Sequence, residues 1–147
     1  MMQSEKTSSS CKFCQIIRKE IASHIVFDDE TACAFLDDRP LFPGHTLLVP
    51  KTHLETLLDI PRDLIAAFFS NAQMLARAVE EALGAEGSFV AINNRVSQSV
   101  PHVHVHIVPR RKSDGLKGFF WPRHPYKNAA EMSATQDAIR RAIERRP

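Results

Sequence analysis

Apolar residues recur every third or fourth position between Pro61 and Gly84, which is the pattern of a helix with one buried face. Proline suits the first turn of a helix and glycine its end, so we expect a helix over residues 61–83. A stretch with apolar side chains on one side predicts a helix over residues 11–20, and the spacing of a capping box begins another over residues 128–145. The apolar positions of the central helix are Leu64, Phe68, Ala72, Leu75, Val79 and Leu83.

Short stretches with strand-like composition alternate with turn residues along the rest of the chain. The first two stretches form a hairpin, and the long helix separates the third from the fourth. This order predicts an α+β fold around a five-stranded, mainly antiparallel sheet, with one long helix and one or two further helices. The expected strands cover residues 25–29, 31–37, 45–50, 88–93 and 102–109.

The chain has 147 residues, which is enough for one domain with a buried core. Its net charge of +2 excludes a nucleic-acid-binding protein that relies on bulk charge. No apolar run is long enough to span a membrane, and the polar start lacks the apolar segment of a secretory signal. We therefore expect a disordered leader over residues 1–10, a single domain over residues 11–147, and a cytoplasmic protein with neither a nucleic-acid nor a membrane partner.

Three histidines alternate with apolar residues at His102, His104 and His106. Alternate side chains of a strand point to the same face, so the three imidazoles are expected on one face and the intervening valines on the other. Neighbouring imidazoles suppress each other's protonation, so at least one stays neutral near pH 7. A neutral imidazole can be a nucleophile, a general base or a metal ligand. The pattern leaves two interpretations open, a zinc hydrolase and nucleophilic histidine catalysis.

Two other groups of residues carry candidate chemistry. Cys11 and Cys14 are separated by two residues, and in a reducing cytosol such a pair is more often a metal clip or a redox motif than a structural disulfide. Asn93, Gln98 and Ser99 precede the histidines, and their amides and hydroxyl can hydrogen-bond phosphate oxygens or orient an imidazole. Ordinary turn formation is the alternative for these three residues.

Residues 102–108 (HVHVHIV) match the pattern of the histidine-triad (HIT) family at every position, and the chain resembles that family. The segments 43–53 (PGHTLLVPKTH) and 98–100 (QSV) add to the match, and residues 13–21 (FCQIIRKEI) resemble the opening helix of the zinc-containing, Hint-like branch. The resemblance is clearest over residues 11–110 and less informative for the tail, 111–147. It implies a HIT-like α+β fold.

The resemblance implies a nucleotide hydrolase or transferase in which His104 attacks the α-phosphate and forms a covalent nucleotidyl-histidine. A nucleoside phosphoramidate, a dinucleoside polyphosphate and a nucleotide sugar all remain open as the substrate. The three histidines are expected to point into a cleft shared with Asn93 and Asp37. The implied supporting residues are His106 and Ser99 at the phosphate and leaving group, Gln98 and Asn93 in the loop that positions the nucleophile, Asp37 at the ribose hydroxyls, and Phe13, Ile16 and Ile21 around the nucleoside.

The family also implies a structural zinc ion and a homodimer. The zinc ligands of the resembling branch correspond here to Cys11, Cys14, His53 and His102, and two thiolates with two imidazoles complete a tetrahedral site. The chain departs from the family in a short loop without glycine at residues 95–97 and in Asp38, which replaces an apolar residue beside the base. Residues 118–123 have no counterpart in the family pattern, and their aromatic side chains are expected to pack in the core or a dimer interface, with substrate contact as the alternative.

Two other functions stay open at this point. A zinc-dependent hydrolase would use metal-activated water and would need an open coordination position. A non-catalytic adaptor would keep the nucleotide pocket and serve a partner protein, although an intact His104 argues against it.

Overall fold

The structure is a computed structural model that describes residues 9–116 and 123–145. The chain divides into two compact units, Met1–Asp114 and Gly115–Pro147, and each is described by itself. Residues 1–8 of the expected leader lie outside the described residues, and the backbone of Ser9 and Ser10 is helical. Residues 117–122, which contain most of the aromatic segment, also lie outside them.

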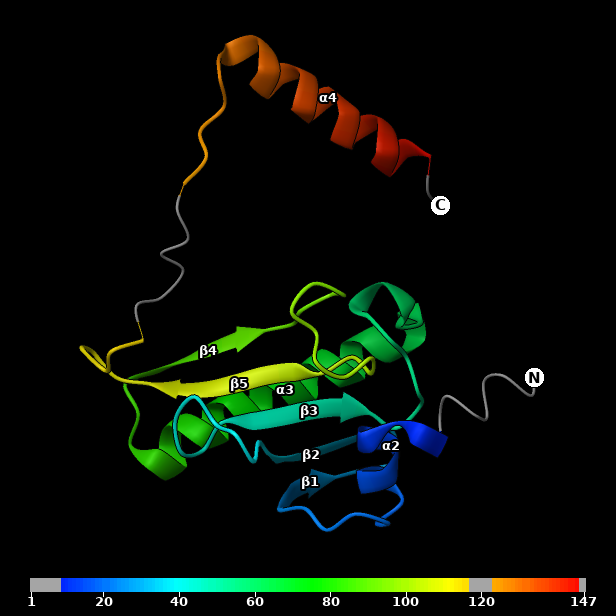
Figure 1. Cartoon of the computed structure of the whole chain (residues 1–147), viewed down its shortest axis with the longest axis vertical. Helices are drawn as coiled ribbons and strands as arrows, with labels where there is room; N and C mark the ends of the chain where they lie inside the picture. Colours follow the sequence, from blue (N-terminus) through cyan, green and yellow to red (C-terminus); the bar gives the residue numbers. More distant parts are fainter. Residues whose placement is uncertain (1–8, 117–122, 146–147) are drawn as a thin grey trace. The chain divides into compact units, whose positions relative to one another are not determined.

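The first unit contains a five-stranded sheet in the order β1-β2-β3-β5-β4, in which every neighbouring pair is antiparallel (Figure 1). The sheet and its helices confirm the predicted α+β fold. The elements are α2 (Lys12–Ile17), β1 (Ile25–Asp28), β2 (Ala32–Leu36), β3 (Thr46–Pro50), the 3₁₀ helix η1 (Leu57–Asp59), α3 (Arg62–Leu83), β4 (Gly87–Ala91) and β5 (Val105–Arg110).

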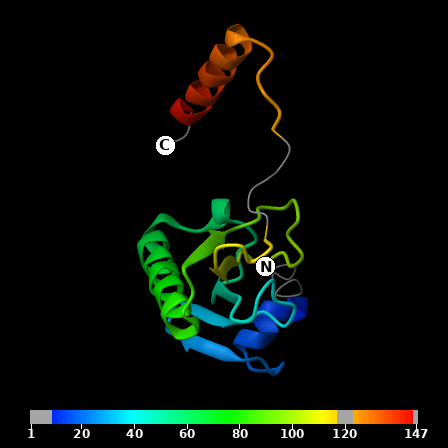
Figure 2. The same cartoon turned by 90° about the vertical axis from the view of Figure 1, so that its left-hand side faces the viewer.

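Helices α3 and α2 lie on opposite faces of the sheet (Figure 2). The strand residues therefore divide by parity into two buried clusters. On the α3 face, Ala32, Ala34, Leu48, Val103, Val105 and Ile107 pack with Phe68, Ala72 and Leu75. On the α2 face, Cys33, Phe35, Leu47 and Val49 pack with Phe13, Cys14 and Ile16. Because both faces are covered, the central strands β2 and β3 are buried on both sides.

Two glycines shape the ends of the elements around the site. Gly84 ends α3 in the left-handed conformation, with a φ of 58°, as expected for the residue after a helix. Gly44 has a φ of 100°, and a Cβ there would clash with Cδ1 of Leu83. Glycine adopts this backbone conformation without strain, and His45 and the start of β3 at Thr46 follow it.

Apart from shifts of one or two residues at the ends of the other strands and helices, the structure differs from the prediction at three places. Strand β5 begins at Val105, so His102 lies before it. The N–H of Val103 donates to the carbonyl of Leu54 (2.7 Å) and not to a neighbouring strand. Helix α2 covers six residues, fewer than the ten expected. The 3₁₀ helix η1 was not predicted, and it is stabilised by a reciprocal capping box between Thr56 and Asp59.

The second unit contains helix α4 (Ala129–Glu144), which corresponds to the expected helix over residues 128–145. The Asn128 side chain accepts a hydrogen bond from the Glu131 N–H (2.8 Å) and so caps the first turn. Among the described residues of the whole chain, no helix is both long and apolar enough to cross a membrane.

Candidate functional site

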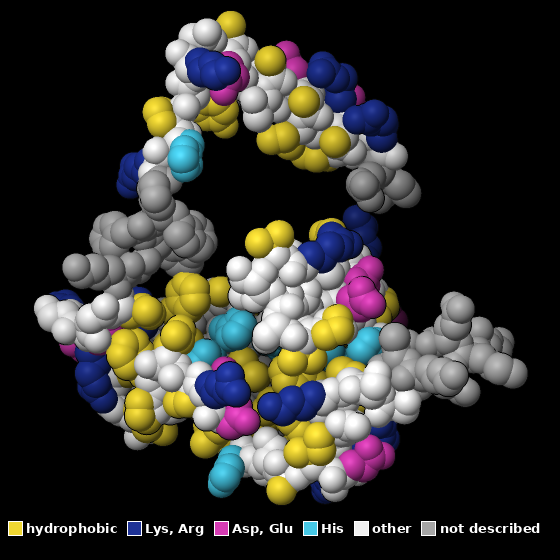
Figure 3. Space-filling model, viewed as in Figure 1, with side chains coloured by type: hydrophobic (Ala, Val, Ile, Leu, Met, Phe, Trp, Pro, Cys, Tyr) yellow, Lys and Arg dark blue, Asp and Glu magenta, His cyan; other side chains and the backbone are white. Residues whose placement is uncertain are grey.

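The three alternating histidines point away from the α3 face, on which Val103, Val105 and Ile107 are fully buried. The predicted alternation is therefore correct, although it starts before β5 begins. The rings of His104 and His106 are in contact, with centroids 4.8 Å apart. The Phe13 ring of α2 meets His104 edge to face at 5.0 Å. Figure 3 shows histidine side chains among apolar ones on one face of this unit.

The His104 ring is oriented by the backbone. Its Nδ1 lies 2.8 Å from the carbonyl oxygen of His102, which can only accept a hydrogen bond. Nδ1 must therefore carry the proton, and Nε2 of a neutral ring keeps its lone pair. The His104 side chain is only 3% exposed, and burial lowers the pKa of the imidazole. The result is a neutral imidazole with a fixed tautomer, which is the form that a nucleophile requires.

A second hydrogen-bonded chain fixes the tautomer of His106. The N–H of Leu41 donates to Nδ1 of His45 (3.1 Å), so Nε2 of a neutral His45 carries the proton. That Nε2 lies 3.0 Å from Nδ1 of His106 and donates to it. His106 consequently carries its own proton on Nε2. Burial, together with His104 and His45, lowers the pKa of His106 to about 4, so the ring is neutral near pH 7.

His45 is a site residue to which the sequence pattern assigned no role. It is buried and lies one residue before β3, on the same face as Leu47 and Val49. The register pairs Leu47 with His106, so His45 is the diagonal neighbour of His106 across the two strands. His45 alternates with Leu47 and Val49 along the chain, and this spacing could have placed it on their face of the sheet. Its contact with His106 could be predicted only if the pairing of β3 with β5 were known.

Asp37 lies beside this chain, with its Oδ2 3.7 Å from Nε2 of His45. The ligand atoms of Asp37, His45 and His106 lie within 4.8 Å of one another, a spacing that a metal ion could also use. A metal on Nε2 of His45 would require loss of the proton that the Leu41 contact places there. We therefore interpret this group as a proton-carrying hydrogen-bond chain.

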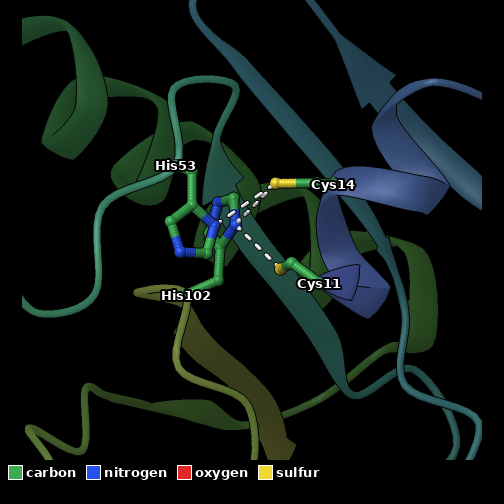
Figure 4. A group of neighbouring side chains, drawn as sticks. All are labelled: Cys11, Cys14, His53 and His102. Carbon is green, nitrogen blue, oxygen red and sulfur yellow. Dashed lines mark hydrogen bonds between the residues drawn. The ribbon is translucent and has the colours of Figure 1, made fainter. Parts of the chain in front are cut away.

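Cys11, Cys14, His53 and His102 converge from α2, the segment after β3 and the segment before β5 (Figure 4). Nδ1 of His102 lies 3.4 Å from Sγ of Cys11 and 3.5 Å from Sγ of Cys14, and Nδ1 of His53 lies 3.3 Å from Sγ of Cys14. Zinc bonds of about 2.3 Å to sulfur and about 2.0 Å to nitrogen at a tetrahedral angle place S and N about 3.5 Å apart. The four side chains thus fit a tetrahedral metal ion.

The tautomer of His102 also suits a ligand. Its Nε2 lies 2.8 Å from the carbonyl oxygen of Pro50, so Nε2 carries the proton and Nδ1 presents a lone pair to the two sulfurs. A backbone acceptor on the far nitrogen is the usual support of a metal-bound histidine. Burial lowers the pKa of His102 to about 4, which keeps the ring neutral. The His102 side chain therefore contacts the two thiols, and the His102 carbonyl accepts the hydrogen bond from His104.

The expected nucleoside residues differ in their exposure. Phe13 and Ile16 are buried in the α2-face cluster, and Phe13 also contacts Phe35 at 5.3 Å between ring centroids. Ile21 follows α2 and is 37% exposed. Phe13 and Asp37 thus lie next to the histidine rings.

The loop before the histidines is held mainly by Gln98. Its Oε1 accepts from the N–H of Arg95 (2.8 Å) and its Nε2 donates to the carbonyl of Glu55, which ties the loop to the segment before η1. The loop-holding role of Gln98 stays a prediction, and these two hydrogen bonds are the contacts through which it would act. Asn93 and Ser99 are exposed beside it.

Comparison with known proteins gives consistent results for sequence and for structure. The chain is 32% identical over 149 residues to an adenylylsulfatase of Arabidopsis thaliana, a match that covers 97% of this chain and 74% of the relative. It is 36% identical over 118 residues to an adenosine 5′-monophosphoramidase of Saccharomyces cerevisiae, with 78% and 71% covered.

Two solved structures match the fold over most of their length. A HIT family member from Bacillus subtilis superposes with a TM-score of 0.82 at 33% identity, covering 90% of this chain and 96% of that one. A zinc-bound histidine triad family protein from Mycobacterium smegmatis gives a TM-score of 0.70 at 36% identity, with 89% and 99% covered. Residues 18–113 match the HIT domain itself. The chain therefore belongs to the HIT family.

Proposed function

We propose that this protein is a nucleotide hydrolase or transferase that cleaves at the α-phosphate through a covalent nucleotide on His104. The observation that carries the proposal is the 2.8 Å contact between Nδ1 of His104 and the carbonyl of His102. It leaves Nε2 unprotonated on a ring that burial keeps neutral. Such a ring can attack phosphorus without first losing a proton.

The reaction follows from these tautomers in two displacements. The Nε2 lone pair of His104 forms a bond to the α-phosphorus as the bond to the leaving group breaks, and the ring keeps its Nδ1 proton against the His102 carbonyl. Water, or another acceptor in a transferase, then attacks the same phosphorus, the N–P bond breaks, and the lone pair returns to Nε2. Dividing the reaction in this way replaces one difficult step by two easier ones.

His106 and Ser99 are the proposed contacts to the phosphate and the leaving group. The chain from Leu41 through His45 places the proton of His106 on Nε2, where it can donate a hydrogen bond to an oxygen that gains charge. Ser99 is exposed at the end of the loop that Gln98 anchors, and its hydroxyl can donate in the same way.

The nucleoside is proposed to lie against Phe13 and Ile16, with Asp37 at the ribose. An ionised carboxylate only accepts hydrogen bonds, so Asp37 suits the two ribose hydroxyls. Ile21 and Asn93 are kept as outer contacts of this pocket, because both are exposed. The two relatives are named an adenylylsulfatase and an adenosine 5′-monophosphoramidase. These names support a nucleoside 5′-phosphate joined to a small leaving group as the substrate class.

Zinc is the proposed occupant of the site formed by Cys11, Cys14, His53 and His102. When bound, zinc would supply structural cross-linking of α2 to the two histidine segments. Four protein ligands complete a tetrahedral shell, so no position remains for a reacting water. This closure disfavours the alternative of a zinc-dependent hydrolase with metal-activated water.

The proposed homodimer is supported by the edge strand β4, which has β5 as its neighbour and carries the exposed apolar side chain of Val90. An exposed apolar edge is a typical place for contact with a second copy. Light scattering coupled to size-exclusion chromatography measures the mass directly, and a monomer at micromolar concentration would contradict the dimer.

A substrate panel tests the proposed function. Purified protein is given adenosine and guanosine phosphoramidates, the corresponding adenylyl sulfates, dinucleoside polyphosphates and nucleotide sugars, and the released mononucleotide is measured. The proposal expects release of nucleoside monophosphate from at least one class and none from the His104→Asn variant. Nucleotide binding without turnover of any class would favour the adaptor alternative.

A further inference from the structure

The three cysteines of the chain are all buried in the α2-face cluster, but their polar neighbours differ. Sγ of Cys11 and Sγ of Cys14 both face Nδ1 of His102, at 3.4 and 3.5 Å. Cys33 lies in β2 and is 1% exposed, against 7% for Cys11 and 4% for Cys14, and no histidine nitrogen is recorded beside its thiol among the described residues. Burial raises the pKa of the Cys33 thiol, which lowers the fraction of thiolate there. No cysteine is in a disulfide, so all three thiols are available for comparison.

We infer that Cys11 and Cys14 form an oxidation site, at which a peroxide converts the pair into an intramolecular disulfide, releases the zinc ion and lowers turnover by loosening His104. The inference rests on the proposed zinc site and goes beyond it, because it assigns the two thiols a reversible chemical change in addition to metal binding.

The geometry allows the disulfide to form within the chain. The two sulfurs belong to a group whose ligand atoms all lie within 4.8 Å of one another. A disulfide needs an S–S distance of about 2.05 Å, so the two sulfurs have to approach from the 4.8 Å or less that separates them here. Cys11 is the N-cap of α2 and has extended backbone, so its dihedral angles can change without breaking the helix.

The chemistry balances with hydrogen peroxide as the oxidant. One thiolate attacks a peroxide oxygen, the O–O bond breaks, and a sulfenic acid forms; the second thiolate then attacks that sulfur and expels hydroxide. The two sulfurs lose two electrons in total, the peroxide gains them, and two protons from solvent complete two water molecules. A disulfide is a poor ligand for zinc, because the thiolate is the form that binds the metal. The metal is therefore released.

The oxidised pair would affect the catalytic histidine through two contacts. The carbonyl of His102 holds Nδ1 of His104, and withdrawal of both sulfurs leaves the His102 ring attached at Nε2, to the Pro50 carbonyl. Phe13 lies between the two cysteines in sequence and packs against His104 at 5.0 Å. A change in α2 can therefore move His104 through two contacts, the hydrogen bond to the His102 carbonyl and the packing of Phe13 against the imidazole ring.

The test uses the zinc-loaded, fully reduced wild-type protein with hydrogen peroxide. Released zinc is followed with a chromogenic chelator, free thiols are counted after denaturation, and the disulfide is located by peptide mass spectrometry. We expect one zinc ion released per chain, a fall in the thiol count from three to one, and a Cys11–Cys14 linkage. Turnover should fall by about ten-fold or more and return after dithiothreitol and zinc are added.

Cys33→Ala is the matched control, because it removes the third thiol and leaves the pair intact. It should lose both remaining thiols and its zinc with the same time course as the wild type. Oxidation of Cys33, linkage between two chains, or full activity in protein that carries the Cys11–Cys14 disulfide would overturn the inference. Zinc retained after disulfide formation would also overturn it.

The same experiment separates this inference from the proposed function. Metal analysis of the reduced protein that finds no zinc would contradict the proposed zinc site, and the disulfide and turnover measurements would then decide alone whether the pair is an oxidation site. Absence of any nucleotide turnover in the reduced protein would contradict the proposed function itself.

Discussion

Nε2 of His45 donates a hydrogen bond to Nδ1 of His106, at 3.0 Å. The proton is on that nitrogen because the N–H of Leu41 already occupies Nδ1 of His45. A backbone amide in the loop before β3 thereby decides which nitrogen of His106 carries its proton. This relationship makes His45 a positioning residue for the proposed phosphate contact.

Replacement of His45 tests this relationship. His45→Leu removes the donor, so His106 can take the other tautomer and kcat should fall by about 10- to 100-fold. His45→Gln keeps an N–H at a similar distance from the backbone and should recover a large part of the rate. Equal rates for the two variants, measured with equal zinc content, would show that the hydrogen bond to His106 does not matter.

Activity should persist to a lower pH than an ordinary histidine would allow. Burial lowers the pKa of His104, and that of His106 is lowered to about 4, so both rings stay neutral as the pH falls through 6.5. The value of kcat/KM should be level from pH 8 to about 6 and fall at lower pH, as the nucleophile is protonated. A midpoint at or above about 6.5, with zinc content constant at each pH, would contradict a buried neutral pair.

Stability should follow the same histidines with a defined sign. The unfolded chain binds a proton at His106 below about pH 6.5, whereas the folded chain resists it until about pH 4. The contribution of neutral His106 to the free energy of unfolding is therefore complete above about pH 6.5. It is lost as the pH is lowered toward 4. Urea titrations at several pH values should show that the decrease is smaller in His106→Asn than in the wild type.

Removal of the two thiol ligands should destabilise the protein. Structural zinc adds to folding free energy, so Cys11→Ser combined with Cys14→Ser should abolish zinc binding and lower Tm by about 10 °C, if about 4 kcal/mol is lost. Differential scanning calorimetry with parallel metal analysis measures both effects. Cys33→Ala should keep its zinc, and unchanged zinc content in the double variant would show that the four-residue group is not the metal site.

Asp37 should discriminate sugars by their hydroxyl groups. Asp37→Asn should weaken binding of ribonucleotides by about ten-fold or more, because a hydrogen bond to a charged acceptor is lost. Analogues that lack both hydroxyls should bind the variant and the wild type with similar affinity, as measured by calorimetry. A loss of the same size for both ligand types would indicate that Asp37 acts through His45, its neighbour at 3.7 Å.

Much of the fold was predictable because it depends on local pattern. The parity of Val103, Val105 and Ile107 placed them on the α3 face, and Pro61 with Gly84 bounded the long helix. The role of His45 was not predictable, because it depends on the register of β3 against β5. The position of His102 before β5 depends on a hydrogen bond between Val103 and Leu54, which are far apart in sequence.

The candidate site also contains features that the sequence predicts and features that depend on the folded structure. The four proposed zinc ligands and the proposed nucleophile could be named from the resemblance to the HIT family, because its motifs carry their spacing. The tautomers could not be, since they depend on the carbonyls of Pro50 and His102 and on the N–H of Leu41. Ile21 is 37% exposed and follows the short helix α2, which ends at Ile17.

The central claim is that Nε2 of His104 forms a covalent bond to the substrate phosphorus, and trapping this intermediate is the most direct test. The enzyme is denatured during turnover of an α-labelled nucleotide substrate at neutral to alkaline pH, digested, and analysed by mass spectrometry. Label on the peptide that contains His104, lost in His104→Asn while fold and nucleotide binding are retained, is the predicted result. Label on another residue, or full turnover by His104→Ala, would contradict the account.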